Sequence, residues 1–250
     1  MRHPTPTPPE LGVHDGLAFA LFVPEDEPVA GVVILHGAGS AKETHFDFAR
    51  GCREDGIAAL AYDARGHGRS GGSFGPGAFD DALAMVELLR EHAPRVALRG
   101  GSMGGFQAIH AGALASGERG DGVCAVVAIC PAPGDWLLRY LRSGRPIEFE
   151  YDAAACEAWL GSLDLYEAAA SLGPGTPLLL MHARGDEEVP YTVSEQLYEA
   201  AREPKRLLLV PGGHHRSVQH DLELQAVSRK FIRDAARNSA RPPAKPARPN

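Results

Sequence analysis

Short apolar runs that alternate with helix-forming segments constrain this chain of 250 residues more than any other feature. Each run is continuous and too short for a buried helix, which is typical of a strand covered on both faces. Strands that alternate with helices predict βα units, right-handed crossovers and a mainly parallel sheet. The predicted strands are 31–35, 57–62, 96–98, 123–130, 178–182 and 206–210, and the predicted helices are 43–55, 78–92, 106–111, 193–202 and 218–237.

Two β-prone segments come before the first of these strands. They cover Leu11–His14 and Leu17–Val23, and the dipeptide Asp15-Gly16 separates them. Asp-Gly between two such segments is a signal for a two-residue turn, because both turn positions need positive φ angles. The sequence therefore predicts an antiparallel hairpin at the start of the domain.

The length and the composition fit one α/β domain over residues 11–236. Apolar residues make up 44% and charged residues 23% of the chain, the balance of an ordinary soluble globular protein. Segments 1–10 and 241–250 hold eight of the twenty prolines, which cannot continue a helix or a central strand. We therefore expect 1–10 and the basic, proline-rich 237–250 to be extended or disordered.

The charge and the cysteine spacing argue against nucleic-acid binding, a disulfide framework and a metal site. The net charge is −7, and residues 237–250 contain four basic residues and no acid, so the remainder carries −11. A body this acidic argues against nucleic-acid binding. The four cysteines, Cys52, Cys124, Cys130 and Cys156, have no Cys-x-x-Cys spacing, so we predict no disulfide framework and no zinc site. No other metal-ligand spacing is visible in the sequence, so we expect chemistry that needs no metal or cofactor. Without a signal segment or 18 consecutive apolar residues, the chain is expected to be cytoplasmic and away from membranes. Oligomeric state is left open.

A glycine-rich turn at 100–105 carries the strongest chemical signal. The predicted strand 96–98 enters it and the predicted helix leaves it, with Ser102 between glycines at positions 100 and 104. Strand, tight turn and helix are the layout of a nucleophile elbow, in which small residues permit a close strand–helix contact. The serine hydroxyl would project from the sheet, and the N–H of Met103 at the helix N-terminus would face the same point.

Other polar residues also follow predicted strands, at the edge where parallel sheets bind ligands. His36, Asp63, Asp186 and His214 take such places. A serine hydroxyl needs a histidine to accept its proton and a carboxylate to orient that histidine. Composition alone leaves Glu187 and Glu188 as rivals of Asp186, and His215 as a rival of His214.

Five stretches, taken together, resemble the serine-type α/β-hydrolases, in the branch with esterases and serine aminopeptidase-like enzymes. The stretches are 36–40 (HGAGS), 63–70 (DARGHGRS), 100–104 (GGSMG), 182–190 (HARGDEEVP) and 212–214 (GGH), and the resemblance spans roughly residues 11–236. The chain order Ser, Asp, His is the order of that family. The resemblance implies a mostly parallel central sheet flanked by helices, with a small helical cap inserted over the active site.

The resemblance also implies roles for single residues. Ser102 is the nucleophile, and Asp186, four residues after His182, is the carboxylate. His214 matches the family's Gly-x-His and is the expected base. The oxyanion donors are the backbone N–H groups of Ala38 and Met103. The segment that begins at Asp63 resembles a structural loop held by Asp63 and Arg65.

An insertion of about 45 residues separates the strands ending at Cys130 and starting at Leu178, too long for an ordinary connection. We assign 132–174 to the cap, and Trp136, Tyr140 and Trp159 to substrate binding, although a core position for the two tryptophans is equally compatible with the sequence. Nine charged residues of the insertion carry a net charge of −3, which predicts an acidic rim and a preference for neutral esters. They are the six acids Asp135, Glu148, Glu150, Asp152, Glu157 and Asp164 and the three arginines Arg139, Arg142 and Arg145.

The expected function is hydrolysis of a small carboxylic ester through an acyl-enzyme intermediate. Amide, peptide or thioester cleavage on the same three side chains is the first alternative. A non-catalytic ligand-binding protein on the same fold is the alternative from another class.

Overall fold

A computed structural model describes residues 7–116 and 122–239 of the chain. The predicted disorder of 1–6 and 240–250 therefore lies outside the described residues. Within them, the first strand already begins at Glu10 and the last helix continues to Ser239. Residues 237–239, assigned from the sequence to the tail, are helical.

One eight-stranded sheet organises the molecule, in the order β1-β2-β4-β3-β5-β6-β7-β8. The neighbours from β4 to β8 are parallel, whereas β1 and β2 join antiparallel, as the hairpin signal predicts. Asp15 and Gly16 adopt φ angles of 51° and 79° in the turn between them. The strands are β1 (Glu10–His14), β2 (Leu17–Phe22), β3 (Ala30–Leu35), β4 (Ile57–Tyr62), β5 (Val96–Gly101), β6 (Val126–Ile129), β7 (Leu178–Ala183) and β8 (Lys205–Val210).

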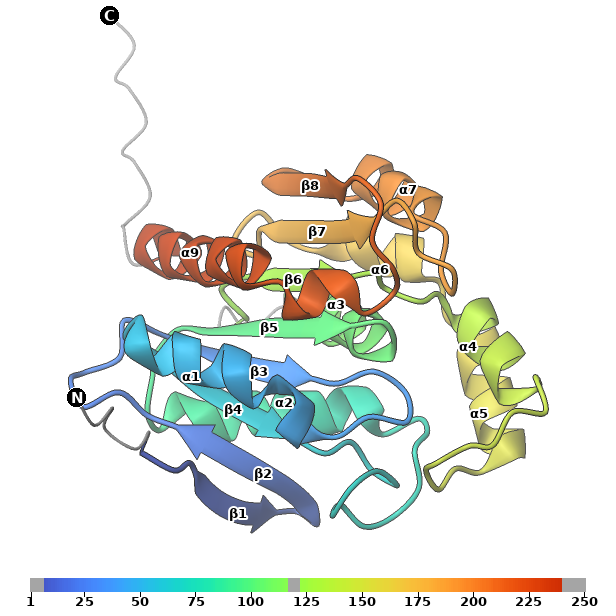
Figure 1. Ribbon diagram of the computed structural model, residues 1–250, viewed down its shortest axis with the longest axis horizontal. Coiled ribbons are helices and arrows are strands. Elements are labelled where there is room, and N and C mark those ends of the chain that lie inside the picture. The colour runs from blue at the N-terminus through green and yellow to red at the C-terminus, as the bar shows by residue number, and fades with distance from the viewer. Residues whose placement is uncertain (1–6, 117–121, 240–250) are drawn as a thin grey trace, which may run out of the picture.

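Helices cover both faces of the sheet (Figure 1). One apolar core joins the sheet to α1 (Phe46–Glu54), α8 (Ser217–His220) and α9 (Leu222–Ser239). The other core joins it to α2 (Ala78–Arg90), α3 (Met103–Ala115), α6 (Leu165–Ser171) and α7 (Thr192–Ala200). Strands β2 to β7 are buried at every position, which explains why their sequences are mostly apolar.

Two predicted helices are interrupted in the structure. The segment predicted at 43–55 begins with the 3₁₀ turn Lys42–His45 before α1. The helix predicted at 218–237 breaks at Asp221, whose backbone is extended between α8 and α9. The Asp221 carboxylate accepts hydrogen bonds from the N–H groups of Glu223 and Leu224 at 2.9 and 3.0 Å and so caps α9.

The cap is smaller than the predicted insertion 132–174. Helices α4 (Gly134–Leu141) and α5 (Ala153–Gly161) pack against each other beside the carboxyl ends of the parallel strands (Figure 1). Helix α6 instead packs against α3 and α7 and belongs to the body of the domain. Within the predicted insertion, α4, α5 and the segment between them therefore form the part that lies beside the strand ends.

All four cysteines lie within the described residues and are buried and free. Among the described residues, no helix has the length and apolarity needed to cross a bilayer.

A buried histidine between α2 and α3 predicts a dependence of stability on pH. His110 is 7% exposed and stacks on Phe79 with ring centroids 4.8 Å apart. Its Nε2 has no hydrogen-bond partner among the described residues. Burial lowers the pKa of His110 from 6.5 to about 4. Between these values the unfolded chain binds a proton that the native protein does not, so stability falls as the pH drops from 6.5 toward 4.

We expect His110→Leu to weaken this acid sensitivity. The depressed pKa costs the wild type about 2 kcal/mol of stability between pH 7 and pH 5, and a leucine at position 110 removes that contribution. Urea unfolding at the two pH values measures the difference, with His92→Leu at an exposed position as the control. An equal loss on acidification in wild type and His110→Leu would contradict the assignment.

Candidate active site

Ser102 occupies the elbow that the sequence predicts, between β5 and α3. Its backbone has φ 54° and ψ −119°, a strained conformation for a residue other than glycine. A Cβ at Gly100 would lie 2.1 Å from the carbonyl oxygen of Gly104, and a Cβ at Gly104 would lie 2.2 Å from that of Leu35. These clashes explain why glycines stand two residues before and two residues after Ser102. Met103 begins α3, so its N–H has no acceptor within the helix.

Asp186 lies on the loop after β7, with its carboxylate fully buried. Its Oδ1 accepts hydrogen bonds from the N–H groups of Glu188 and Val189 at 2.9 and 2.8 Å. Its Oδ2 accepts from Nδ1 of His215 at 2.8 Å and lies 3.2 Å from Nε2 of His182. Burial by itself raises the pKa of Asp186, but the hydrogen bonds from His182, His215 and Val189 outweigh it and hold the pKa well below its usual range. The carboxylate is therefore ionised at neutral pH.

The structure brings His215, and not His214, to this carboxylate. The choice of His214 as the partner of Asp186 is wrong. The side chain of His214 is turned toward its own loop, where its Nδ1 accepts the N–H of Arg216 at 3.3 Å. The backbone N–H of His215 donates to the Glu187 carboxylate at 3.1 Å, and this hydrogen bond holds the backbone of His215 in place. Gly212 and Gly213, at φ 66° and 78°, turn the chain so that the second histidine faces Asp186.

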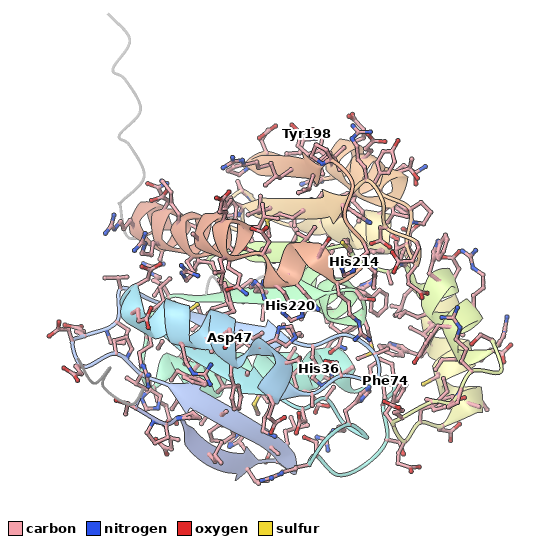
Figure 2. The ribbon with its side chains drawn as sticks, viewed as in Figure 1. His36, Asp47, Phe74, Tyr198, His214 and His220 are labelled. Carbon is pink, nitrogen blue, oxygen red and sulfur yellow. The ribbon has the colours of Figure 1, made fainter. Side chains whose placement is uncertain are left out.

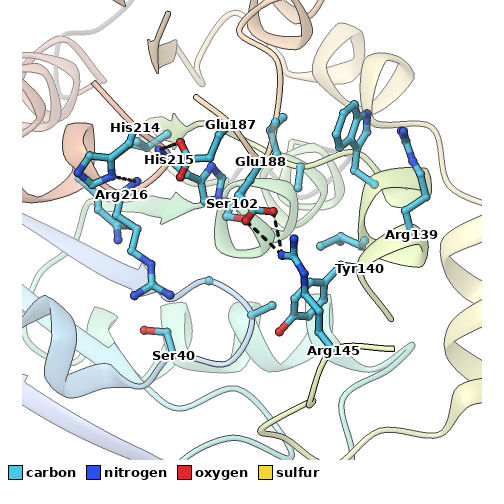
Figure 3. A pocket seen from close by; sticks show the side chains of 18 of the residues that line it. Ser40, Ser102, Arg139, Tyr140, Arg145, Glu187, Glu188, His214, His215 and Arg216 are labelled. Carbon is cyan, nitrogen blue, oxygen red and sulfur yellow. Dashed lines mark hydrogen bonds and ion pairs between the residues drawn. The ribbon is translucent and has the colours of Figure 1, made fainter. Parts of the chain in front are cut away.

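The hydrogen bonds fix the tautomer of His215. An ionised carboxylate can only accept, so Nδ1 of His215 carries the proton. Nε2 of the neutral ring is then left with a free lone pair. Ser102 and His215 line the same pocket (Figure 3). A base with its lone pair available and a strained serine in one pocket are the parts that nucleophilic catalysis requires.

His182, at the end of β7, contacts the Asp186 carboxylate on the side of the protein interior. It is fully buried, its Nε2 lies 2.9 Å from the carbonyl oxygen of Val189, and its Nδ1 lies 2.7 Å from Oγ of Ser194. A carbonyl only accepts, so Nε2 carries the proton and Nδ1 accepts from the Ser194 hydroxyl. Cys130, His182 and Asp186 together form a group of metal-ligand types, but both His182 nitrogens are already used in hydrogen bonds.

The loop after β3 runs beside the elbow. A Cβ at Gly37 would lie 3.5 Å from Cβ of Ser102, and Gly37 and Ala38 both line the pocket. Buried His36 holds this loop because its Nε2 accepts the N–H of Ala64 at 2.9 Å, which leaves Nδ1 to donate to the carbonyl of Gly37 at 2.8 Å. Burial lowers the pKa of His36, so the ring stays neutral in this role. His36, His214 and His220 all lie at the carboxyl ends of the strands (Figure 2).

The loop that follows Asp63 is structural, as the sequence predicts. The buried Asp63 carboxylate accepts from Nζ of Lys42 at 2.6 Å and from the N–H of Arg69 at 2.9 Å. Arg65 binds Asp81 at 2.8 Å. Asp63 is not among the residues that line the pocket.

A pocket of about 540 Å³ opens over Ser102 between the cap and the strand ends. Trp136 and Tyr140 of α4 line it, as predicted. Trp159 does not, and its assignment to substrate binding is wrong. Its ring packs against Phe74, Phe79 and Phe106, with centroids at 5.6, 5.1 and 6.1 Å, so it joins the cap to the core.

The expected acidic rim is also wrong. Among the described residues, none of the six insertion acids lines the pocket, whereas Arg139 and Arg145 do. Asp135 pairs with Arg139 at 2.8 Å and Glu157 pairs with Arg142. Asp152 and Asp164 cap the N-termini of α5 and α6. Counting charges along the chain could not show that these four carboxylates are engaged in local ion pairs and helix caps.

No motif in the sequence predicts the contact that joins the elbow strand β5 to α8. Arg99 of β5 is fully buried, stacks over Phe48 at 3.8 Å and donates to the carbonyl of Gln219 at 3.2 Å. Burial lowers the pKa of Arg99 to about 10. The side chain of Gln219 lies against Gly101, where a Cβ would be 2.5 Å from its Oε1. Arg99 thereby links the strand that carries Ser102 to the helix that follows His215.

The strand order, the helices on both faces and the strained serine between β5 and α3 define an α/β hydrolase. The chain belongs to the α/β-hydrolase superfamily. This confirms the fold class that the sequence motifs imply.

Comparisons with known proteins agree with this class. The family model for serine aminopeptidase, S33, matches residues 26–144. The protein YfhR of Escherichia coli (strain K12) is 28% identical over 197 residues, covering 77% of this chain and 65% of YfhR. YqkD of Bacillus subtilis (strain 168) is 30% identical over 208 residues, covering 77% of this chain and 66% of YqkD. The chain thus matches about two thirds of the length of these relatives.

Among solved structures, Est1E from Butyrivibrio proteoclasticus with bound ferulic acid superposes with a TM-score of 0.69. The two chains share 20% sequence identity, and the match covers 92% of this chain and 98% of Est1E. At this identity the likeness concerns the fold.

Proposed function

We propose that this protein is a serine hydrolase that cleaves a small carboxylic ester through an acyl-enzyme intermediate on Ser102. The observation that carries the proposal is the 2.8 Å hydrogen bond from His215 to buried, ionised Asp186, in a pocket that also contains the strained Ser102. A nucleophile, a base with one defined tautomer and a carboxylate that orients the base are the parts required for acyl transfer.

In the first half-reaction, Oγ of Ser102 attacks the ester carbonyl carbon while Nε2 of His215 takes the hydroxyl proton. The carbonyl π electrons move to oxygen, and the N–H groups of Ala38 and Met103 are the proposed donors to this oxyanion. The intermediate collapses, the carbon–oxygen bond to the alcohol breaks, and His215 returns its proton to the departing alcohol. Asp186 remains ionised and stabilises the imidazolium.

In the second half-reaction, water attacks the acyl group on Ser102 and gives one proton to His215. The second tetrahedral intermediate collapses to the carboxylic acid, and the proton passes from His215 to Oγ of Ser102. The reaction balances with water alone, so no redox partner is needed. Because the mechanism requires a neutral base, kcat/KM should decrease on the acidic side of its profile.

The cap side of the pocket supplies apolar surface for one substituent of the ester. Ala132, Trp136, Leu137 and Tyr140 line that side. Arg139 lies 3.8 Å over the ring of Trp136 and holds it in place. A pocket of about 540 Å³ is within the usual range for small-molecule sites. We therefore assign Trp136 and Tyr140 to acyl-chain or alcohol binding.

A panel of 4-nitrophenyl esters with graded acyl chains tests the proposal. We expect turnover by the wild type, and we expect Trp136→Ala to change the ratio of kcat/KM between hexanoate and acetate about fivefold or more. Trp159→Phe is the matched control because Trp159 packs in the core, outside the pocket lining.

Matched amide and thioester substrates in the same panel separate the alternatives. Preference for the amide or the thioester would replace the ester in the proposal. Binding of the esters with no turnover would favour a ligand-binding protein and overturn it. An unchanged chain-length profile in Trp136→Ala would remove Trp136 from substrate binding.

A further inference from the structure

Arg216 stands apart among the charged residues that line the pocket. It follows His215 directly in the chain, and its side chain extends across the pocket toward Ser40 on the loop after β3 (Figure 3). Its backbone is fixed by the hydrogen bond from its N–H to Nδ1 of His214. The guanidinium is thus carried on the same loop as the proposed base and lines the same pocket as Ser102.

The other pocket charges already have partners. Arg145 binds Glu188 at 3.2 Å, and Arg139 binds Asp135 at 2.8 Å. Glu187 accepts the N–H of His215 at 3.1 Å. No carboxylate within 7–116 or 122–239 pairs with Arg216. Arg216 is thus a cation whose hydrogen-bonding capacity remains available to a ligand.

The wall toward which the Arg216 side chain extends is polar. Besides Arg216 itself, it contains Ser40, Thr44, Gln219 and His220, and the pocket's two acids, Glu187 and Glu188, come from the loop after β7. Cap side chains Trp136, Leu137 and Tyr140 make the apolar side. The pocket therefore offers an apolar side and a cationic side to the two ends of one substrate.

We propose that the preferred ester carries an anionic group, a carboxylate or a phosphate, which Arg216 binds. The proposal rests on the proposed ester hydrolysis at Ser102 and names its substrate class. Arginine donates two parallel hydrogen bonds to such oxyanions, a geometry that lysine and neutral donors do not reproduce. This proposal is the opposite of the preference for neutral esters that the composition of the insertion predicts.

Two esters of equal chain length test this inference. They are the 4-nitrophenyl monoester of glutaric acid and 4-nitrophenyl pentanoate, which differ in the terminal carboxylate. We expect the ratio of kcat/KM for the anionic to the neutral ester to fall about tenfold in Arg216→Gln. Arg216→Lys should retain part of the ratio, and added salt should lower the ratio in the wild type. Arg202→Gln, at an exposed position outside the pocket, should leave the ratio unchanged.

Competition separates the two sources of the anion. Stronger inhibition by glutarate than by inorganic phosphate identifies the carboxylate, and the reverse order identifies the phosphate. Equal ratios in wild type and Arg216→Gln would overturn the role of Arg216 while leaving ester hydrolysis intact. Failure of the wild type to turn over either ester would instead overturn the proposed function.

Discussion

Replacing His215 with alanine is expected to lower kcat for ester hydrolysis by about 10⁴-fold, whereas His214→Ala should cost less than about tenfold. His215 donates from Nδ1 to Asp186 at 2.8 Å, which leaves Nε2 free to accept the serine proton. His214 uses Nδ1 to accept a backbone N–H and has no carboxylate partner among the described residues. The two neighbours are the same residue type on the same loop, so each variant is the control for the other.

Steady-state kinetics on both purified variants measures the difference, with circular dichroism and a thermal unfolding curve to confirm that each remains folded. If His214→Ala lost the larger share of kcat, the pairing of His215 with Asp186 would not be the catalytic arrangement. Similar moderate losses in both variants would contradict a single base.

Asp186→Asn should also lower kcat by about 10⁴-fold near neutral pH. The amide oxygen of asparagine can still accept from Val189, but the amide nitrogen presents a donor to Nδ1 of His215. This favours the wrong tautomer, in which Nε2 carries the proton and cannot accept one from Ser102. The loss should appear mainly in kcat, because Asp186 does not line the pocket.

Glu187→Gln and Glu188→Gln are the matched controls, since the sequence alone left these acids as rivals of Asp186. Glutamine at 187 can still accept the N–H of His215, and Glu188 is engaged with Arg145. We expect each to retain more than about a tenth of wild-type kcat. A larger loss in Glu187→Gln than in Asp186→Asn would contradict the assignment of the carboxylate.

The parts of the fold that sequence reasoning predicted depend on local rules. Continuous apolar runs identified buried strands, because most positions of a strand covered on both faces are occupied by apolar side chains. Asp15-Gly16 identified the hairpin turn through its positive φ angles. The elbow could be predicted because only glycine fits at positions 100 and 104, where a Cβ would meet backbone atoms.

The parts that were wrong depend on contacts between distant segments. Adjacent His214 and His215 are equivalent in spacing, and the turn at Gly212 and Gly213 decides which ring reaches Asp186. Trp159 and Trp136 both lie on cap helices, but the orientation of α5 against Phe79 puts one ring in the core. The break at Asp221 could not be predicted, because it depends on the Asp221 carboxylate accepting the N–H groups at the start of α9.

Mapping the adduct of a fluorophosphonate tests the central claim, that Ser102 is the nucleophile of a serine hydrolase. Such a reagent forms a covalent bond only with an activated hydroxyl, so it reports on the serine and on its base together. We predict a single modification on the peptide that contains Ser102, loss of labelling in Ser102→Ala and slower labelling in His215→Ala. Labelling that persists in Ser102→Ala, or a modified peptide from another part of the chain, would contradict the account.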